Sequence, residues 1–282
     1  QTIQTMKTNR LLSILAALTI TTSAFAQAQI TTKKEKVSDF TLKTMKVVLS
    51  GNEFIDQAVR EAINNTWSLS PFEFCTHEEF DNLKTSEDYY FMVPVKAKYK
   101  RESAPGVMML CVVKGKPEAK DVNNMVDIVS MPMCAADIPS GRENAMLPGL
   151  MHIIQGYIYK SMQSGFKSLS SYTRPLYSAS KRRTILCEDD LCEAISEKTK
   201  AKALKKGIEI TDDATADSLF LDGGARTLVS YVVAPTDPEN GSYCWKFLID
   251  AKTHDLYYFK KQKITKPELS GFQKSDLAKI SK

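Results

Sequence analysis

The stretch FEFCTHEEFDNL at 72–83 has a counterpart 136 residues later, IEITDDATADSL at 208–219. In both stretches a short alternating run, typical of a strand, precedes a short helical pattern. Leu83 matches Leu219 at the same offset as the strand residues. The tripeptide SGF also occurs twice, at 164–166 and 270–272. A shared tripeptide means little by itself, so the test of a repeat is whether the surrounding elements follow in the same order.

The two halves of the chain predict the same series of elements. The first half predicts a strand at 44–50, an amphipathic helix at 52–67, a strand at 71–76, a helical turn at 77–83, and strands at 89–99, 106–113 and 125–133. The second half predicts a strand at 182–187, a helix at 188–206, a strand at 208–212, a helix at 213–221, and strands at 226–234, 242–250 and 255–265.

This common order predicts an α/β to α+β fold. It contains two similar β-α-β-α-β-β-β units, each with a mixed sheet. The order favours an internal duplication, although α/β chains without a common origin can look alike at this level. We expect the first unit at 44–175 and the second at 176–282, after an N-terminal linker at 27–43. The first unit carries an extra helix at about 143–163, whose apolar stripe is expected to bridge the two units.

The N-terminus has the pattern of a secretory signal peptide. A basic start at Met6–Arg10 is followed by the apolar run LLSILAALTI and by Ala24-Phe25-Ala26, an A-x-A cleavage site. Residues 1–26 are therefore expected to be an upstream extension and signal peptide, cleaved between Ala26 and Gln27. The apolar run is shorter than the ~20 residues that span a bilayer, and no later stretch predicts a membrane span. We expect an exported protein in the periplasm or on the surface of a bacterium.

The charge of the chain gives no electrostatic reason to expect nucleic-acid binding. The formal net charge is +5 at pH 7, and removal of Lys7 and Arg10 with the signal peptide lowers it to +3. The basic run KTKAKALKK at 198–206 is better explained as the solvated face of a helix than as a phosphate-binding stripe.

Six cysteines remain in the exported chain, where an oxidising compartment permits disulfides. Cys187 and Cys192 are the best candidate pair, because they lie five residues apart across an expected strand-to-helix junction. Geometry decides whether they pair, so small buried thiols remain the alternative.

No catalytic residue, metal ligand or cofactor site is predicted. His77-Glu78-Glu79 begins like the zinc motif H-E-x-x-H, but Asp81 stands where the second histidine is needed. The chain has three histidines and no G-x-S-x-G elbow. A Cys75–His77 pair is conceivable as a nucleophile and base, and so is a pair of glycosidase-like carboxylates, since both depend on spatial separation.

Several segments resemble exported proteins of Bacteroidota-type bacteria to which no activity is assigned. These segments are the signal peptide, WSLSPFEF at 67–74, LIDAKTHDLYY at 248–258 and the closing SGF. The resemblance implies an envelope location and brings no site residues. We expect a non-enzymatic binding or assembly module with an envelope protein as partner, and the oligomeric state stays open. The alternatives are a hydrolase of envelope or dietary polymer and a structural component of a surface assembly.

Overall fold

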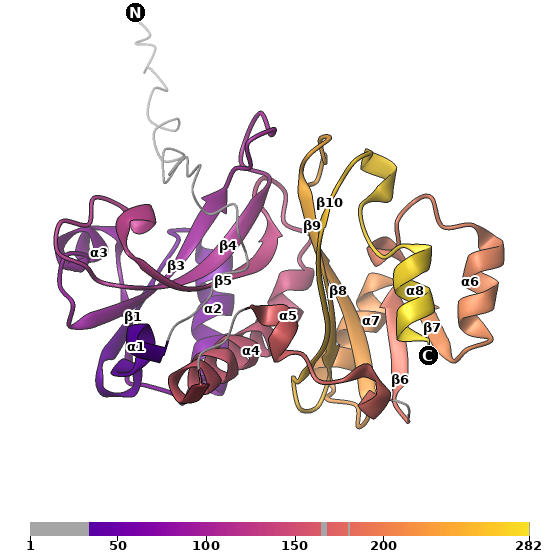
Figure 1. Ribbon diagram of the computed structural model, residues 1–282, viewed down its shortest axis with the longest axis horizontal. Helices are drawn as coiled ribbons and strands as arrows, with labels where there is room; N and C mark the ends of the chain where they lie inside the picture. Colours follow the sequence, from indigo (N-terminus) through magenta and orange to yellow (C-terminus); the bar gives the residue numbers. More distant parts are fainter. Residues whose placement is uncertain (1–33, 165–167, 180, 282) are drawn as a thin grey trace, which may run out of the picture.

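The computed structural model describes residues 34–164, 168–179 and 181–281, so the predicted signal peptide and the cleavage site at Ala26 and Gln27 lie outside the described residues. The described chain forms two five-stranded mixed sheets, the left and right halves of Figure 1. The predicted fold class is confirmed. The first sheet has the order β2 (Phe72–Cys75), β1 (Thr44–Val48), β3 (Tyr89–Ala97), β4 (Val107–Lys114), β5 (Val126–Ala135). The second has the order β7 (Ile208–Thr211), β6 (Arg183–Cys187), β8 (Thr227–Val233), β9 (Tyr243–Asp250), β10 (Leu256–Lys263).

Equivalent strands of the two sheets share their register as well as their order. β1 and β2 run parallel with Met45 opposite Phe72, and β6 and β7 run parallel with Thr184 opposite Ile208. Phe72 and Ile208 therefore occupy the same place in the two units. The offset of 136 residues that is visible in the sequence is thus a structural equivalence, which is consistent with a duplication.

In each unit, one helix follows the first strand and another follows the second. Asn52, the N-cap of the first of these helices, accepts hydrogen bonds from the backbone of Phe54 and Ile55, and Thr76 and Glu79 form a capping box at the next helix. No helix among the described residues is both long enough and apolar enough to cross a membrane. The helices are α1 (Lys34–Val37), α2 (Glu53–Thr66), α3 (His77–Leu83), α4 (Arg142–Ser164), α5 (Leu169–Tyr172), α6 (Glu197–Leu204), α7 (Asp213–Leu221) and α8 (Lys274–Ile280).

The extra helix of the first unit, α4, joins the two units as expected. It contacts α1, α2 and β5 of the first unit and α7 of the second. Gly149 sits where α4 meets α7, and a Cβ at this position would lie 2.8 Å from Cζ of Phe220. The helices can approach this closely only because Gly149 has no side chain. Leu150 and Ile154 are buried in a hydrophobic core that includes residues of both units.

The helix predicted at 188–206 is wrong in its first half. The structure has a 3-10 turn at Glu188–Asp190, and the regular helix α6 begins only at Glu197. Leu191 instead forms a β-bridge with Phe272, and the Cys192 amide donates to the Phe272 carbonyl at 3.0 Å. The backbone that a helix would need is therefore paired with a segment some 80 residues later in the chain.

This pairing also explains the second SGF tripeptide. Gly271 has φ of +96°, and a Cβ at this position would lie 2.6 Å from the carbonyl oxygen of Asp190. Only glycine accommodates both this backbone conformation and this close approach. In the first copy, Gly165 and Phe166 lie outside the described residues, so the equivalence of the two tripeptides stays a prediction.

The described part of the segment predicted as a linker, 34–43, packs onto the first unit. Phe40 is fully buried against the rings of Trp67 and Tyr90. The Asp39 carboxylate accepts hydrogen bonds from Tyr90 Oη and from Lys114 Nζ, which lies at 2.8 Å. These contacts attach residues 34–43 to the first unit, with Phe40 in its core.

The candidate Cys187–Cys192 disulfide is not formed in the structure. All six cysteines lie within the described ranges, and all are buried free thiols. Cys187 packs in the core that includes both units, whereas Cys192 packs in a second cluster with Leu191 and Phe272. Because the two side chains belong to different clusters, one of them would have to leave its cluster for the bond to form.

Candidate functional site

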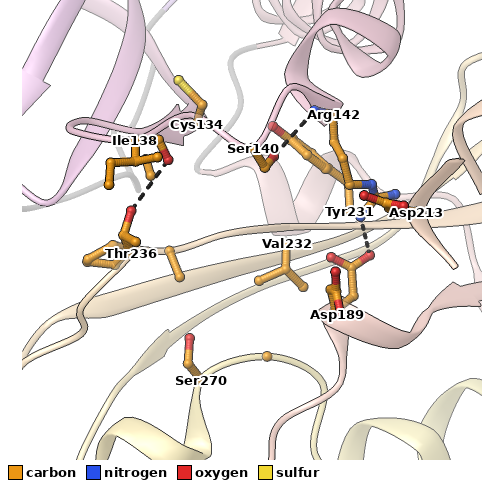
Figure 2. A pocket seen from close by; sticks show the side chains of 15 residues that line it. Cys134, Ile138, Ser140, Arg142, Asp189, Asp213, Tyr231, Val232, Thr236 and Ser270 are labelled. Atoms are coloured by element: carbon orange, nitrogen blue, oxygen red, sulfur yellow. Dashed lines mark hydrogen bonds and ion pairs between the residues drawn. The ribbon is translucent and has the colours of Figure 1, made fainter.

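A cavity of about 300 Å³ lies between the two units, and we call it the inter-unit pocket. Figure 2 shows Arg142 and Asp213 at one end of it, and Thr236 and Ile138 at the other. It forms where the connection from β5 to α4 meets β8, the turn at 188–190 and the C-terminal segment. Its lining is Cys134, Ala135, Ile138, Ser140 and Arg142 from the first unit, and Asp189, Asp190, Asp213, Tyr231, Val232, Ala234, Pro235, Thr236, Ser270 and Gly271 from the second.

Arg142, the first residue of α4, anchors one end of the pocket. Its side chain is 6% exposed and forms ion pairs with Asp190 at 3.0 Å and with Asp217 at 2.9 Å. It also donates to the carbonyl of Ser230 at 3.1 Å. The guanidinium of the first unit thus pairs with two carboxylates of the second, so this cation links the two units.

Hydrogen bonds hold Asp190, one of the two acidic partners of Arg142, in place. Asp190 is 3% exposed, and one of its carboxylate oxygens accepts a hydrogen bond from Ser230 Oγ. The same hydroxyl oxygen accepts from the amide of Cys187 at 2.9 Å. The position of Asp190 is thus set by strands β6 and β8, which lie next to each other in the second sheet.

The protonation states follow from burial and from these pairs. Burial alone would lower the pKa of Arg142, but Asp190, Cys187 and Asp217 raise it above its ordinary value, so the guanidinium stays charged. Burial raises the pKa of Asp217 above its ordinary value, although Arg142 opposes this shift. The positive charge of Arg142 is therefore already paired with carboxylates of the protein itself.

Tyr231 makes a second link between the units. Its hydroxyl donates to the carbonyl oxygen of Met133 on β5, and its ring lies 5.7 Å below the Arg142 guanidinium. Burial raises the pKa of Tyr231 well above its ordinary value. The phenol is thus a fixed hydrogen-bond donor, which positions the floor of the pocket rather than taking part in proton transfer.

The rim of the pocket carries groups that can bind a ligand. Asp189 and Asp213 place carboxylates at one end, and Ser140 and Ser270 add hydroxyls. Ile138 is 67% exposed and adds an apolar surface at the other end. This combination suits a ligand or peptide segment that has both polar and apolar groups.

The nucleophile and metal sites that were weighed from the sequence gain no support from the geometry. Burial raises the pKa of Cys75 to about 11, so this thiol stays protonated at neutral pH and is a poor nucleophile. His152 and His254 lie near each other, with ring centroids 6.0 Å apart, while His77 starts α3 in the first unit. No group of three or more His, Cys, Asp or Glu side chains in the described chain is placed to hold a metal ion.

Sequence reasoning missed the residues that build this pocket. The sequence places Asp189 and Asp190 at the start of the helix predicted at 188–206, and it gives Arg142 no role. A signal for Arg142 was available, because it stands one helical turn before Met146 and two turns before Leu150, on the apolar side of α4. A charged residue on an apolar stripe indicates a buried ion pair.

Comparisons with known protein families, curated proteins and solved structures returned no match.

One partly buried acid outside the pocket, Asp127, allows a direct test of the electrostatics. Burial raises the pKa of Asp127, on β5, to about 7, although Lys36 and Ser130 oppose this shift. A folded-state pKa above the ordinary value means that the carboxyl contributes stability when it is protonated. That contribution is complete below about pH 4 and is lost as the pH rises through 7.

We therefore expect Asp127→Asn to stabilise the protein by about 1–2 kcal/mol at pH 8 and by much less at pH 5. Urea denaturation at the two pH values measures this difference. The matched control is Asp88→Asn, which changes an exposed acid next to β3 and should move stability by less than about 0.5 kcal/mol. A loss of stability at pH 8 in Asp127→Asn would contradict the prediction.

Proposed function

We propose that this protein is an exported envelope protein that acts as a non-enzymatic binding module, with its ligand or a partner segment held in the inter-unit pocket. The observation that supports binding is that the cation of this pocket is paired within the protein, whereas several of its carboxylates and hydroxyls line the cavity. Arg142 is held by Asp190 and Asp217, while Asp189, Asp213 and the nearby hydroxyls line the cavity. The pocket thus offers hydrogen-bonding groups on a rigid frame. Export rests on the N-terminal sequence pattern.

Site-specific photo-cross-linking in intact cells tests this proposal. A photoreactive amino acid is placed at Ile138, which is 67% exposed at the pocket, or at Leu221, which is 64% exposed on α7 and does not line it. We expect an adduct of discrete mass from position 138 and none from position 221. Equal adducts from both positions, or none from position 138, would count against the pocket as the binding site.

A hydrolase remains the second candidate, because Asp189, Asp190 and Asp213 lie around one cavity. Carboxylates that converge in a cleft are the arrangement that glycoside hydrolysis requires. Against this role, the Asp190 carboxylate forms an ion pair with Arg142 and accepts a hydrogen bond from the Ser230 hydroxyl. The hydrolase hypothesis requires polymer cleavage that Asp213→Asn abolishes. A structural role through the edge strands β5 and β10 remains a third proposal.

A further inference from the structure

A second cavity lies beside the inter-unit pocket, where equivalent hairpins of the two units meet. The turn between β3 and β4 contacts the turn between β8 and β9, and the Ser103 amide donates to Glu239 Oε1 at 3.0 Å. A Cβ on Gly106 would lie 2.6 Å from Cγ of Pro235, so glycine is needed for this close approach. The cavity between the turns has a volume of about 210 Å³. We call it the hairpin cavity.

The side chains that line the hairpin cavity carry charge of one sign. Four carboxylates belong to the lining, Glu102, Asp137, Asp237 and Glu239, and the lining contains no lysine or arginine. Hydrogen bonds from Ser103 lower the pKa of Glu239 below its ordinary value, so this group is ionised at neutral pH. The lining is thus acidic, and Lys98 lies next to it, where its ammonium donates to the Ser103 carbonyl at 2.6 Å.

Glu102 distinguishes this cavity from an ordinary acidic surface. Its side chain is 6% exposed, and Oε2 accepts a hydrogen bond from the Tyr99 amide at 2.8 Å. Its other oxygen, Oε1, is buried and has no hydrogen-bond partner. A buried carboxylate oxygen without a donor is costly, and a donor supplied by a ligand would remove that cost.

From these contacts we infer that the hairpin cavity binds a small organic cation, either a protonated primary amine or a guanidinium, with Glu102 Oε1 as its main acceptor. Both groups offer several N–H donors together with a positive charge, which match a carboxylate inside an acidic rim. The volume is below the range of pockets for drug-sized ligands, so it fits a single side chain or a small amine. A metal ion is less suitable, because no described group of three or more acidic, histidine or cysteine side chains is placed to hold one.

The proposed ligand has two sources with the same chemistry, a free amine and a lysine or arginine side chain of a partner. Isothermal titration calorimetry with agmatine probes the first, and an acetyl-Gly-Arg-Gly-amide peptide probes the second. Tighter binding of the peptide than of agmatine assigns the site to a basic side chain, and the reverse order assigns it to a free amine. N-butylurea, which carries neither the guanidinium nor the ammonium of agmatine, should not bind.

Variants test the assignment of Glu102. We expect Glu102→Gln to weaken binding of the better probe by about ten- to hundred-fold, because it removes the charge and keeps an acceptor for the Tyr99 amide. The matched control, Glu78→Gln, changes an exposed glutamate on α3 and should bind like the wild type. If Glu102→Gln fails to fold, Asp237→Asn at the exposed rim should still weaken binding by about two- to five-fold.

Two results would overturn this inference. One is the absence of binding of both cationic probes to the wild-type protein at 10 mM. The other is equal binding by a folded Glu102→Gln variant or, where that variant does not fold, by Asp237→Asn. Neither result depends on what occupies the inter-unit pocket, since photo-cross-linking at position 138 reports on that pocket separately. The failure of one proposal is therefore distinguishable from the failure of the other.

Discussion

Replacing Asp276 with alanine is expected to lower the free energy of unfolding by about 3–5 kcal/mol. Asp276 lies in α8, is 1% exposed, and pairs with Lys246 Nζ at 2.6 Å. Lys246 is fully buried on β9, so removal of its partner leaves a charge in the protein interior. The same carboxylate accepts hydrogen bonds from Tyr258 at 2.8 Å and from the Gln273 amide at 2.9 Å, and both are lost as well.

The pH dependence of this interaction has a defined sign. Burial alone would raise the pKa of Asp276, but hydrogen bonds from Lys246 and Lys260 lower it to about 2. A folded-state pKa below the ordinary value means that the ionised form contributes stability. That contribution is complete above about pH 4 and is lost as the pH falls through 2. The cost of Asp276→Ala, measured by urea denaturation, should therefore be constant between pH 5 and 8.

Two controls separate the buried charge from the loss of contacts. Lys260→Ala removes the second, partly exposed partner of Asp276 and should cost less than about 1 kcal/mol. The double variant Lys246→Met with Asp276→Leu removes both buried charges and should recover most of the stability. A single-variant cost below 1 kcal/mol, or a double variant no more stable than Asp276→Ala, would contradict this explanation.

Local pattern was sufficient to predict most of the fold. The alternation in Phe72-Glu73-Phe74 and its counterpart at 208–210 is a property of neighbouring residues, and it identified equivalent strands. The apolar stripe of α4 likewise predicted both its helix and its bridging position. Helices form their backbone hydrogen bonds internally, and many strands pair with strands nearby in the chain. Such elements have a periodic pattern of apolar residues that can be recognised in the sequence.

The features that were missed depend on residues far apart in the chain. The non-helical backbone at Leu191 results from its bridge to Phe272, and the burial of Asp190 results from Arg142. Neither is visible in any short window of sequence. The hairpin cavity could not be predicted for the same reason. Glu102 and Glu239 belong to different units, and they line one cavity because the equivalent turns contact each other.

The two cavities lie where the two similar units meet, and each is lined by residues of both units. The connection from β5 to α4 carries Ile138, and α4 itself begins with Arg142, whereas in the second unit a longer connection, 264–273, leads from β10 to α8. The C-terminal segment with Gly271 packs against Asp190. The inter-unit pocket therefore combines strand residues with the β5–α4 connection and the C-terminal segment, whereas the hairpin cavity lies between equivalent turns and also includes Asp137 of that connection.

Replacing Arg142 with methionine is expected to have the other large effect, a loss of about 3–5 kcal/mol in the free energy of unfolding. Methionine fills a similar volume but leaves the buried Asp190 carboxylate without its cation. Urea denaturation at pH 7 measures the cost. The matched control is Arg174→Met, which removes an ion pair to Asp255 at 2.8 Å whose arginine is 56% exposed. This surface pair should contribute less than about 1 kcal/mol.

A second readout separates a loss of overall stability from a loosened junction. Cys134 lines the inter-unit pocket and is 3% exposed, and burial raises the pKa of its thiol to about 12. If Arg142 holds the units together, alkylation of Cys134 in the native protein should be faster in Arg142→Met than in Arg174→Met. Adding Asp190→Asn to Arg142→Met should recover part of the stability, because the unpaired charge is then gone. Equal costs for the two arginine variants, with unchanged Cys134 reactivity, would show that the ion pairs of Arg142 do not hold the two units together.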